Sequence, residues 1–429
     1  MQAQIRSKMK EDNNMRKVIV TGGGASGLTA AVFAARNGNQ VTILEHKDRV
    51  GKKILMTGNG RCNLTNMSDF HGKYYSSDEK SLHKIYDTLV SFGANDARDF
   101  FESMGLYTKE KKDGCVYPVS EQASAVLDVL RCECERLGVR TITGCEVHSI
   151  TPYKKGGRVS VRYLEENGKK RQAEFSYDKL ILATGGKAAP VSGSDGSGYQ
   201  LVQKLGHKVI KPLPALVQLR CEGSFFKAVS GVRAQAGITL YIDGKASAFE
   251  EGELQLTDYG ISGIPVFQFS RVAARALDRE KRCEAGIHFL PYVEDLEGFI
   301  KQNVDGERYG YKTVEELLGG MVHKKIASII CKKNKTGAGV KVSEAGKEAV
   351  RRCILELADF RVKIIGANPF EHAQVCSGGV PLGEVSACFA SKFCRDVYLV
   401  GELLDCDGIC GGYNLQWAWA TGAIAGKSV

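Results

Sequence analysis

Short apolar runs that end near glycines are the first pattern along this chain. The segment at 16–20 predicts a strand, and the alanine-rich stretch at 25–37 predicts a helix that stops at Gly38. A second strand is predicted at 40–44. A strand, a helix and a strand within about thirty residues form a βαβ unit, which implies a parallel sheet.

Two later apolar runs extend the predicted sheet. The runs at 180–183 and 397–400 have the length of buried strands, and each leads into glycines, at Gly185 and Gly401. Glycines follow strands in this way where the carboxyl ends of parallel strands face a ligand. The chemistry of the protein is therefore expected at these glycine-rich strand ends.

The pattern changes between residues 206 and 370. Strand-like alternation comes first, for example at 238–242, which Asp243 and Gly244 close with a turn. Charged helical segments follow at 291–350. This change of pattern indicates an insertion into the first domain.

The composition is that of an ordinary globular chain. Its 429 residues are 43% apolar and 25% charged, which suits two or three domains of roughly 100 to 200 residues each. No apolar stretch approaches the roughly 18 to 20 residues of a membrane span, and at 1–14 we expect a disordered leader rather than a signal peptide. The 14 cysteines scatter without a targeting signal, which favours reduced thiols. These features predict a cytoplasmic protein without a membrane anchor.

The chain is basic, with 59 Lys and Arg against 49 Asp and Glu and a net charge of +10. This balance suits a cofactor that carries phosphates or, less readily, nucleic acid. A lysine cluster at 324–335 has no interleaved aromatic residues to stack on bases, so a solvated surface is the favoured interpretation. We do not expect nucleic-acid binding, and no histidine pattern predicts a metal site.

A dinucleotide fingerprint lies at 22–27. Gly22 permits a tight turn, Gly24 lets the backbone approach a pyrophosphate, and Gly27 allows close packing of helix on strand. The helix that follows turns its partial positive charge towards the phosphates. Glu45 ends the second strand, where its carboxylate can accept hydrogen bonds from ribose hydroxyls. The chain has one such fingerprint, so a second domain for a nicotinamide cofactor is not expected.

Longer motifs resemble one bacterial flavoprotein family. They lie at 51–66, 183–186, 193–199, 257–263 and 401–420. Together they resemble the HI0933-like flavoproteins, whose members include aminoacetone-oxidase-like proteins and a reductase of 3-dehydro bile acids. The resemblance covers nearly the whole chain. It implies an α/β fold with a Rossmann-like FAD domain of the glutathione-reductase type at 15–205 and 371–429, an inserted β-barrel at 206–290 and 351–370, and a helical subdomain at 291–350.

The resemblance also implies which residues hold FAD. The segment at 22–27 and Glu45 would hold the ADP half, the loop around Arg61 would lie near the flavin, and the turn at 407–412 would reach the ribityl chain and the pyrimidine edge. NADH or NADPH would be a transient electron donor, and a small organic molecule would be the substrate. The expected cofactor contacts are Gly22, Gly24, Ala25, Ser26, Gly27, Glu45, Lys53, Gly60, Arg61, Cys62, Asn63, Val147, Thr184, Gly185, Gly401, Glu402, Asp407, Gly412, Tyr413, Asn414 and Leu415.

The C-terminal segment also favours a flavin on physical grounds. A strand that ends at Gly401, a glycine-dense loop and a helix that begins near Tyr413 would aim free backbone N–H groups at one point. Such a helix end stabilises the negative charge of a reduced flavin at its pyrimidine edge. Glu402 and Asp407 could accept hydrogen bonds from ribityl hydroxyls or be solvated loop charges, and the sequence leaves both open.

Two residues are candidates for catalysis. Cys62 lies in a segment expected near the flavin, but the chain has no Cys-x-x-Cys pair, and a buried structural cysteine is favoured over a redox thiol. Dithiol chemistry would require Cys62 and Cys410 to meet. Tyr117, in a loop expected to lead into a helix, could donate a proton after hydride transfer, although a packing aromatic before Pro118 is the simpler interpretation.

Three enzymatic functions remain open at this point, beside a flavin-binding sensor without turnover. The favoured one is the NAD(P)H-driven reduction of activated C=C bonds through flavin N5, with bile-acid-like or steroid-like enones as candidate substrates. Oxidation of an amine is the alternative within the same class. An RNA-modifying flavoprotein is the competitor from another class, because the net charge and the lysine cluster suit a polyanion. The oligomeric state is not predicted.

Overall fold

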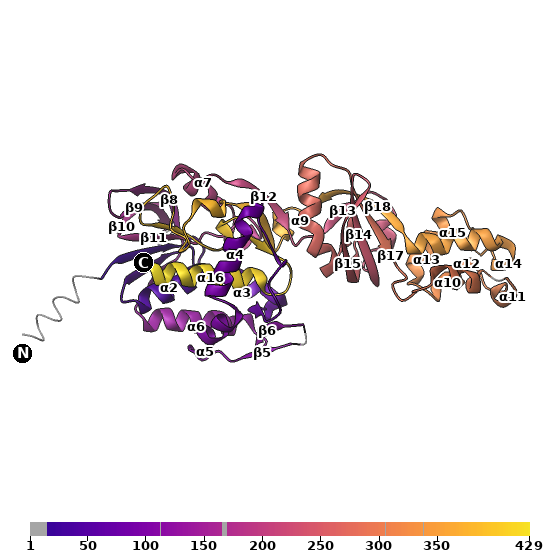
Figure 1. The fold of residues 1–429 in the computed structure, drawn as a ribbon, viewed down its shortest axis with the longest axis horizontal. Coiled ribbons are helices and arrows are strands. Elements are labelled where there is room, and N and C mark those ends of the chain that lie inside the picture. Colours follow the sequence, from indigo (N-terminus) through magenta and orange to yellow (C-terminus); the bar gives the residue numbers. More distant parts are fainter. Residues whose placement is uncertain (1–14, 112, 165–169, 305, 338) are drawn as a thin grey trace, which may run out of the picture. The chain divides into compact units, whose positions relative to one another are not determined.

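The computed structural model of this protein describes residues 15–111, 113–164, 170–304, 306–337 and 339–429. The leader expected to be disordered, 1–14, lies outside the described residues. By its internal contacts the chain divides into two units. The first unit consists of residues up to Leu213 together with Val375–Val429, and the second unit is Pro214–Gln374. Figure 1 labels the elements of both units.

The first unit is built on a five-stranded parallel sheet with the order β20-β11-β1-β2-β7. All four strands predicted above are present in this sheet, each within one residue of its expected ends. Helices cover a parallel sheet on both faces, and the continuous apolar runs of β1 and β11 are buried accordingly. The strands are β1 (Lys17–Thr21), β2 (Gln40–Leu44), β7 (Arg140–Ile142), β11 (Lys179–Leu182) and β20 (Val397–Leu399).

Two helices that are far apart in the sequence pack against each other in the first unit. α2 (Ala25–Arg36) contacts α16 (Tyr413–Ser428) along its length, and the two ribbons lie side by side in Figure 1. A glycine of α16 permits this approach, because a Cβ atom on Gly422 would lie 2.5 Å from the backbone carbonyl oxygen of Ser26. The C-terminal helix therefore fixes the position at which α2 begins.

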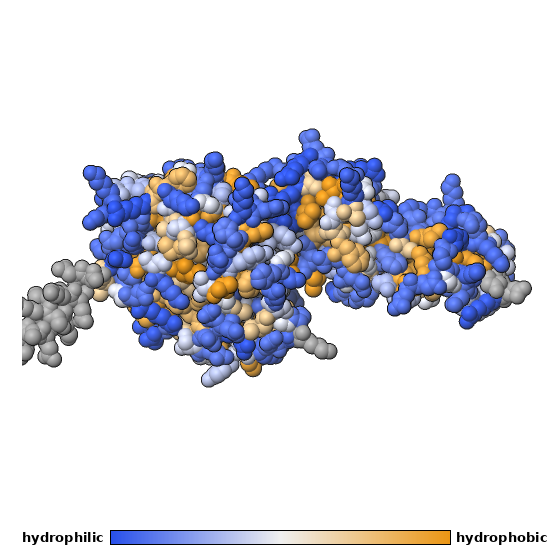
Figure 2. Space-filling view, in the orientation of Figure 1, coloured by the Kyte–Doolittle hydropathy of each residue, from blue (hydrophilic) through white to orange (hydrophobic). Residues whose placement is uncertain are grey.

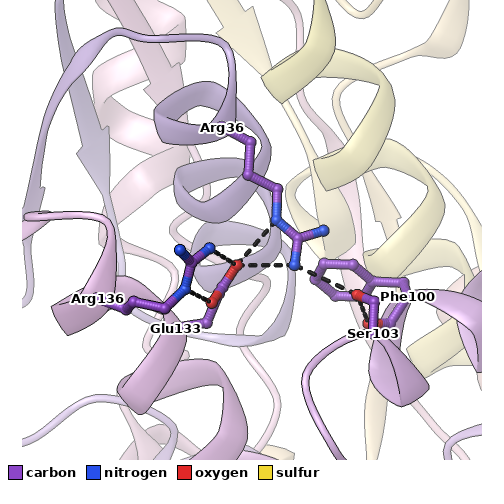
Figure 3. Close-up of polar contacts among 5 residues, drawn as sticks. All are labelled: Arg36, Phe100, Ser103, Glu133 and Arg136. Carbon is purple, nitrogen blue, oxygen red and sulfur yellow. Dashed lines mark hydrogen bonds and ion pairs between the residues drawn. The ribbon is translucent and has the colours of Figure 1, made fainter.

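A buried carboxylate ties α2 to α6 (Ala123–Arg136). Glu133 accepts hydrogen bonds from Arg36, at 2.9 Å from Nε and 2.8 Å from Nη2, and from Arg136 on its own helix (Figure 3). The Arg36 guanidinium also faces the Phe100 ring at 5.5 Å and donates to the Ser103 hydroxyl at 3.3 Å. The two guanidinium groups, Arg136 foremost, hold the pKa of the Glu133 carboxyl below its ordinary value. This charged network fixes the C-terminal end of α2.

Smaller sheets and short helices complete the first unit. β8, β9 and β10 form an antiparallel sheet, β3, β6 and β5 form another, β21 pairs with β4, and β12 pairs with β19. The strands are β3 (Thr65–Asn66), β4 (Tyr74–Tyr75), β5 (Thr108–Glu110), β6 (Cys115–Pro118), β8 (Cys145–Pro152), β9 (Gly157–Leu164), β10 (Lys170–Tyr177), β12 (Ile210–Ala215), β19 (Val375–Gly379) and β21 (Asp407–Gly408). The helices are α3 (Lys52–Met56), η2 (Thr57–Gly60), η3 (Glu79–Ser81), α4 (Leu82–Ser91), α5 (Ala94–Glu102), η4 (Pro190–Ser192), α7 (Ser197–Lys204), η6 (Leu382–Glu384) and η7 (Gly401–Leu403).

The second unit contains a closed six-stranded barrel with the order β13-β16-β15-β14-β17-β18. The predicted turn at Asp243 and Gly244 joins β14 to β15, and both residues have positive φ angles, as this type of hairpin turn requires. The elements are β13 (Leu219–Cys221), α8 (Phe226–Val229), β14 (Arg233–Ile242), β15 (Lys245–Leu256), β16 (Gly260–Ser262), α9 (Ile264–Asp278), β17 (Cys283–His288), β18 (Phe360–Ala367) and η5 (Phe370–His372).

A helical segment lies between β17 and β18. Its last helix, α15, continues past the expected end at 350, because Val350, Ile354 and Leu357 keep the helical spacing of buried apolar residues. The helices are α10 (Leu296–Asn303), α11 (Gly306–Tyr309), α12 (Val314–Gly319), α13 (Lys324–Lys333), α14 (Val342–Ala345) and α15 (Lys347–Ala358). The fold class predicted from the sequence, a Rossmann-like domain with an inserted barrel and a helical subdomain, is thereby confirmed.

Among the described residues, no helix combines the length and the apolar character needed to cross a bilayer. On the face drawn in Figure 2, hydrophilic side chains surround the apolar patches of both units.

Candidate cofactor and active site

The turn at 22–27 is shaped by glycines in three different ways. Gly22 has a φ of +98°, and a Cβ atom there would lie 2.4 Å from the carbonyl oxygen of Ala183. A Cβ atom on Gly27 would lie 1.9 Å from the carbonyl oxygen of Gly22, so only glycine lets α2 approach the turn. A Cβ atom on Gly24 would meet no heavy atom within 4 Å. Backbone atoms therefore leave no room for a side chain at Gly22 or Gly27, whereas the space beside Gly24 is free of protein atoms.

The carboxylate of Glu45 supports this turn from behind. It is buried, and its Oε2 accepts a hydrogen bond from the Gly23 N–H at 2.7 Å, while Oε1 accepts one from the Lys47 N–H at 2.8 Å. Each carboxylate oxygen has a second lone pair that can accept a further hydrogen bond. Glu45 thus positions the glycine turn and can still receive a ribose hydroxyl.

Helix α2 begins directly at this turn. Gly24 is its N-cap residue, and no side chain caps the first turn. The unpaired N–H groups and the helix dipole favour an anion at this end. Ala25 and Ser26 open the helix, and a Cβ atom on Gly401 would lie 2.5 Å from the Ser26 hydroxyl oxygen. The structure therefore brings the start of α2 and the start of the C-terminal motif together.

A second helix start lies at the C-terminal motif. Gly412, with a φ of +96°, is the N-cap of α16, again without a side-chain cap and without an acidic residue in the first turn. A Cβ atom on Gly412 would lie 2.6 Å from the Thr65 carbonyl oxygen and 3.0 Å from Oδ1 of Asn63. Two segments expected near the flavin, the loop at 57–66 and the turn at 407–412, therefore meet at the N-terminus of α16.

Side chains of α16 hold both of these segments. Trp419 donates from Nε1 to the Leu64 carbonyl oxygen at 2.9 Å, and Trp417 donates to the Gly401 carbonyl oxygen at 3.2 Å. The Thr421 hydroxyl accepts from the Gly401 N–H at 3.0 Å. Gln416 accepts from the Thr65 hydroxyl at 2.7 Å and donates to the Phe92 carbonyl oxygen at 2.9 Å. None of these residues is among the cofactor contacts expected from the sequence, although the tryptophans of the motif at 401–420 were a usable signal.

Among the expected contacts in the C-terminal motif, Asn414 has the clearest role. Its side chain accepts from the Gly408 N–H and donates to the Gly408 carbonyl oxygen, each at 2.8 Å. Asp407 is buried on β21, where it lies opposite Tyr75 of β4. The carbonyl oxygen of Tyr413 accepts from the Tyr74 hydroxyl at 2.8 Å. These contacts shape the turn that precedes α16.

Glu402 is paired in the structure and is not a solvated loop charge. Its Oε2 lies 2.6 Å from the Lys53 Nζ, and its Oε1 accepts from the Cys376 N–H at 2.8 Å. Both partners of the ion pair are largely buried. The pair ties α3 to the strand end at Gly401, so Lys53 and Glu402 act together in holding the site. Val147 lies on β8, opposite Val161.

Cys62 is poorly suited to redox chemistry. Its side chain is fully buried, and this burial raises the pKa of the thiol to about 12. A thiol with such a pKa carries almost no thiolate at neutral pH, and the thiolate is the reactive form. None of the 14 cysteines, all of which lie in the described part of the chain, forms a disulfide. The structure therefore favours a structural role for Cys62 over the catalytic one.

Tyr117 lies on strand β6 and not in the loop that the sequence predicted. The strand forms because Val116 inserts into the core and pairs with Thr65 of β3. The Tyr117 ring packs close to the turn at Gly58, since a Cβ atom there would lie 3.5 Å from the ring. Burial, more than its charged neighbours, raises the pKa of the phenol. Tyr117 is therefore protonated at neutral pH, as a proton donor must be.

A cavity of about 310 Å³ opens beside the N-terminus of α16. It is lined in part by Asn66, Phe70, Tyr74, Gly93 and Tyr413. Asn66 donates to the Gly411 carbonyl oxygen at 3.0 Å, so the cavity wall is continuous with the turn that precedes α16. A small organic molecule in this cavity would lie next to both segments that meet at that helix.

Comparison with known proteins decides the family. The model of the HI0933-like protein Rossmann domain matches residues 16–428. The chain belongs to the HI0933-like family. The resemblance inferred from the sequence motifs is thereby confirmed.

Two relatives match this HI0933-like protein over almost their whole length. A 3-dehydro-bile acid delta(4,6)-reductase of Clostridium scindens is 40% identical over 421 residues, which are 96% of this chain and 99% of that protein. A ribosomal RNA dihydrouridine synthase of Haemophilus influenzae is 28% identical over 414 residues, 96% of this chain and 98% of that protein.

The solved structure of 3-ketosteroid delta1-dehydrogenase from Sterolibacterium denitrificans, in complex with 1,4-androstadiene-3,17-dione, has a similar fold. Its TM-score is 0.50 at 12% identity, over 97% of this chain and 99% of that one. At this identity the likeness concerns the fold alone. Family membership and the Rossmann-like fold together support a flavin-dependent oxidoreductase.

Buried polar atoms of this HI0933-like protein fit a bound dinucleotide. Among the described residues, Oδ1 of Asn63 and Oγ1 of Thr184 are buried and have no hydrogen-bond partner within the protein. Such atoms are costly unless a ligand or water satisfies them. Both belong to segments expected to contact the cofactor, and the open space at Gly24 lies in a third. The residues present therefore suit FAD.

Proposed function

We propose that this HI0933-like protein is an NAD(P)H-driven reductase of activated C=C bonds, with steroid-like or bile-acid-like enones as candidate substrates. The observation that carries the proposal is the full-length relative at 40% identity, which is named a 3-dehydro-bile acid delta(4,6)-reductase. FAD, when bound, would accept hydride from NADH or NADPH and pass it from its N5 position to the substrate.

The residues of the first unit would hold FAD at three places. The uncapped start of α2 and the open space at Gly24 would receive the pyrophosphate. The unpaired side-chain oxygens of Asn63 and Thr184 would find hydrogen-bond partners on the bound FAD. The uncapped start of α16, at Gly412, would stabilise the negative charge of the reduced pyrimidine edge. Lys53, Glu402 and Asn414 would keep these groups in position.

Tyr117 would supply the proton that completes reduction of the double bond. Its phenol is half-buried, its pKa is raised by burial, and its ring packs at the turn of the loop expected near the flavin. When hydride adds to the β-carbon of an enone an enolate forms, and a phenol in this state can protonate the α-carbon of that enolate.

An anaerobic experiment with the purified holoprotein tests the proposal. NADH or NADPH should bleach the flavin absorbance, and a steroid enone should restore it. The Tyr117→Phe variant should slow the reoxidation roughly 100-fold and leave the reduction by nucleotide unchanged. Tyr107→Phe is the matched control, because Tyr107 is 73% exposed. Bound flavin that no conjugated enone reoxidises would overturn the proposal.

A second candidate is the reduction of uracil in RNA. The relative named ribosomal RNA dihydrouridine synthase favours it, and this reaction also saturates a conjugated C=C bond. RNA binding that falls steeply as salt rises, together with flavin reoxidation by RNA, would support this candidate over the steroid one. Peroxide formation with an amine in air would instead support the amine oxidase expected as the alternative.

A further inference from the structure

Three cationic side chains gather on one face of the β5–β6 hairpin in the first unit. Lys109 pairs directly with Tyr117 across the strands, so both side chains project from the same face. Lys111 lies two residues further along, and its N–H continues the ladder to the Cys115 carbonyl oxygen at 2.9 Å. The alternation of a strand therefore places Lys111 on the face of Lys109 and sends Glu110 to the other.

These cations converge on one carboxylate. Oε1 of Glu121 lies 2.8 Å from Nζ of Lys109 and 3.4 Å from Nζ of Lys111. Arg61 completes the group, with its Nη1 3.8 Å from Oε2 of Glu121. Lys109 lowers the pKa of the Glu121 carboxyl most, and Lys111 next. Asp113, in the turn of the hairpin, accepts from the Cys115 N–H instead.

The cluster surrounds the aromatic ring proposed as the proton donor. Nζ of Lys111 lies 4.4 Å from the centroid of the Tyr117 ring, and Cζ of Arg61 lies 5.6 Å from it. Between a third and a half of each cationic side chain is exposed, so a molecule from solvent can reach all three. One carboxylate does not neutralise three cations, and a planar guanidinium beside two ammonium groups suits an oxyanion.

We propose that Arg61, Lys109 and Lys111 form an oxyanion site that binds a carboxylate or phosphate group of the substrate or of the electron donor. The proposal rests on the proposed function and deepens it, because an anionic tail held here would lie beside Tyr117. Glu121 competes with the ligand for the same three cations. Removing a lysine should therefore weaken ligand binding, and removing the charge of Glu121 should strengthen it.

The test compares charged and neutral forms of the same ligand. A steroid enone with a carboxylate side chain and its methyl ester are reduced by wild-type protein and by Lys109→Gln and Lys111→Gln. The KM for the acid should rise roughly three- to fivefold in each variant, while kcat and the KM for the ester stay unchanged. Glu121→Gln should lower the KM for the acid. Lys109→Arg should retain the wild-type value, and Lys204→Gln, an exposed lysine of α7, is the control.

A second arm separates the two sources of the oxyanion. A rise in the KM for NADPH but not for NADH in the lysine variants would assign the site to the 2′-phosphate of the donor. Unchanged values for acid, ester and both nucleotides would overturn the proposal. If no enone reoxidises the wild-type flavin, the proposed function fails by itself. Binding of inorganic phosphate to wild-type protein and to the double variant K109Q/K111Q then decides, since equal affinity would reject the oxyanion site.

Discussion

The two glycine-rich turns of the first unit, at 22–27 and at 407–412, are held by different means. The first is closed by backbone carbonyl oxygens, which lie 2.4 Å and 1.9 Å from the Cβ positions of Gly22 and Gly27, and Glu45 supports it from the neighbouring strand. The second is held by side chains of α16, above all by Asn414. Both precede a helix whose N-terminus has no side-chain cap. The comparison teaches that one anion-binding geometry can be closed by the backbone of a distant strand end, as at Ala183, or shaped by a side chain of the helix that the turn precedes.

The largest expected effect separates two glycines of the first turn. Gly27→Ala should destabilise the apoprotein by about 3 kcal/mol, because its methyl group would overlap the Gly22 carbonyl oxygen. Gly24→Ala should cost less than about 1 kcal/mol, because its methyl group meets no atom of the protein, yet it should weaken FAD binding at least tenfold. Denaturant titration of the apoprotein and fluorescence titration with FAD measure the two effects. Wild-type FAD affinity in Gly24→Ala would contradict the role given to Gly24.

The second turn should depend on a side chain in the same way. Asn414→Ala removes the hydrogen bonds to both backbone groups of Gly408, and we expect a loss of about 2 kcal/mol in unfolding free energy together with weaker FAD binding. Asn37→Ala is the matched control, since its side chain makes one exposed hydrogen bond, to the Lys427 carbonyl oxygen. A control loss as large as that of Asn414→Ala would remove the distinction between the two turns.

Two threonines with buried hydroxyl groups allow a further test of this comparison. Thr65→Val breaks the hydrogen bond to Gln416 and should destabilise the apoprotein by about 1 kcal/mol. Thr184→Val removes a hydroxyl that has no partner, so the apoprotein should keep or gain stability. The rise in melting temperature on adding FAD should shrink in Thr184→Val. An undiminished rise would show that Thr184 does not meet the cofactor.

The smallest expected effect concerns pH and Cys62. Burial raises the pKa of this thiol from 9.0 to about 12, so the folded protein keeps a proton that the unfolded chain loses as pH rises above 9. The contribution of this thiol to stability is complete below pH 9, and by pH 10 about 1 kcal/mol of it should be lost. Cys62→Ser should show a shallower fall in unfolding free energy over this range. Equal slopes would mean that the thiol ionises in the folded state.

Local pattern was enough to predict much of the fold. The strands of the sheet lie where apolar runs predicted them, and Gly412 begins the helix expected near Tyr413. The strand β6 was not predicted, because it is only four residues long. It also depends on pairing with β3 and β5, and β3 is distant in the sequence. Tyr117 was therefore assigned to a loop.

The candidate site was predictable in its motifs but not in its supports. The fingerprint glycines and Asn63 stand in recognisable motifs, whereas Trp419 and Gln416 act through contacts with segments hundreds of residues away, at Leu64 and Phe92. Trp417 contacts the strand end at Gly401. No spacing rule reports such contacts. The ion pair of Lys53 with Glu402 was missed for the same reason, although both residues were expected near the cofactor.

By itself the sequence determined the βαβ unit, the dinucleotide turn and the family, because these depend on residue types at short and regular spacing. Only the tertiary structure decided that Cys62 is buried, that Asn63 meets the start of α16, and that Lys109 and Lys111 share a face with Tyr117. The physical reason is that burial, pKa and charge clustering depend on which distant segments pack together, and this follows from the whole core rather than from any local pattern.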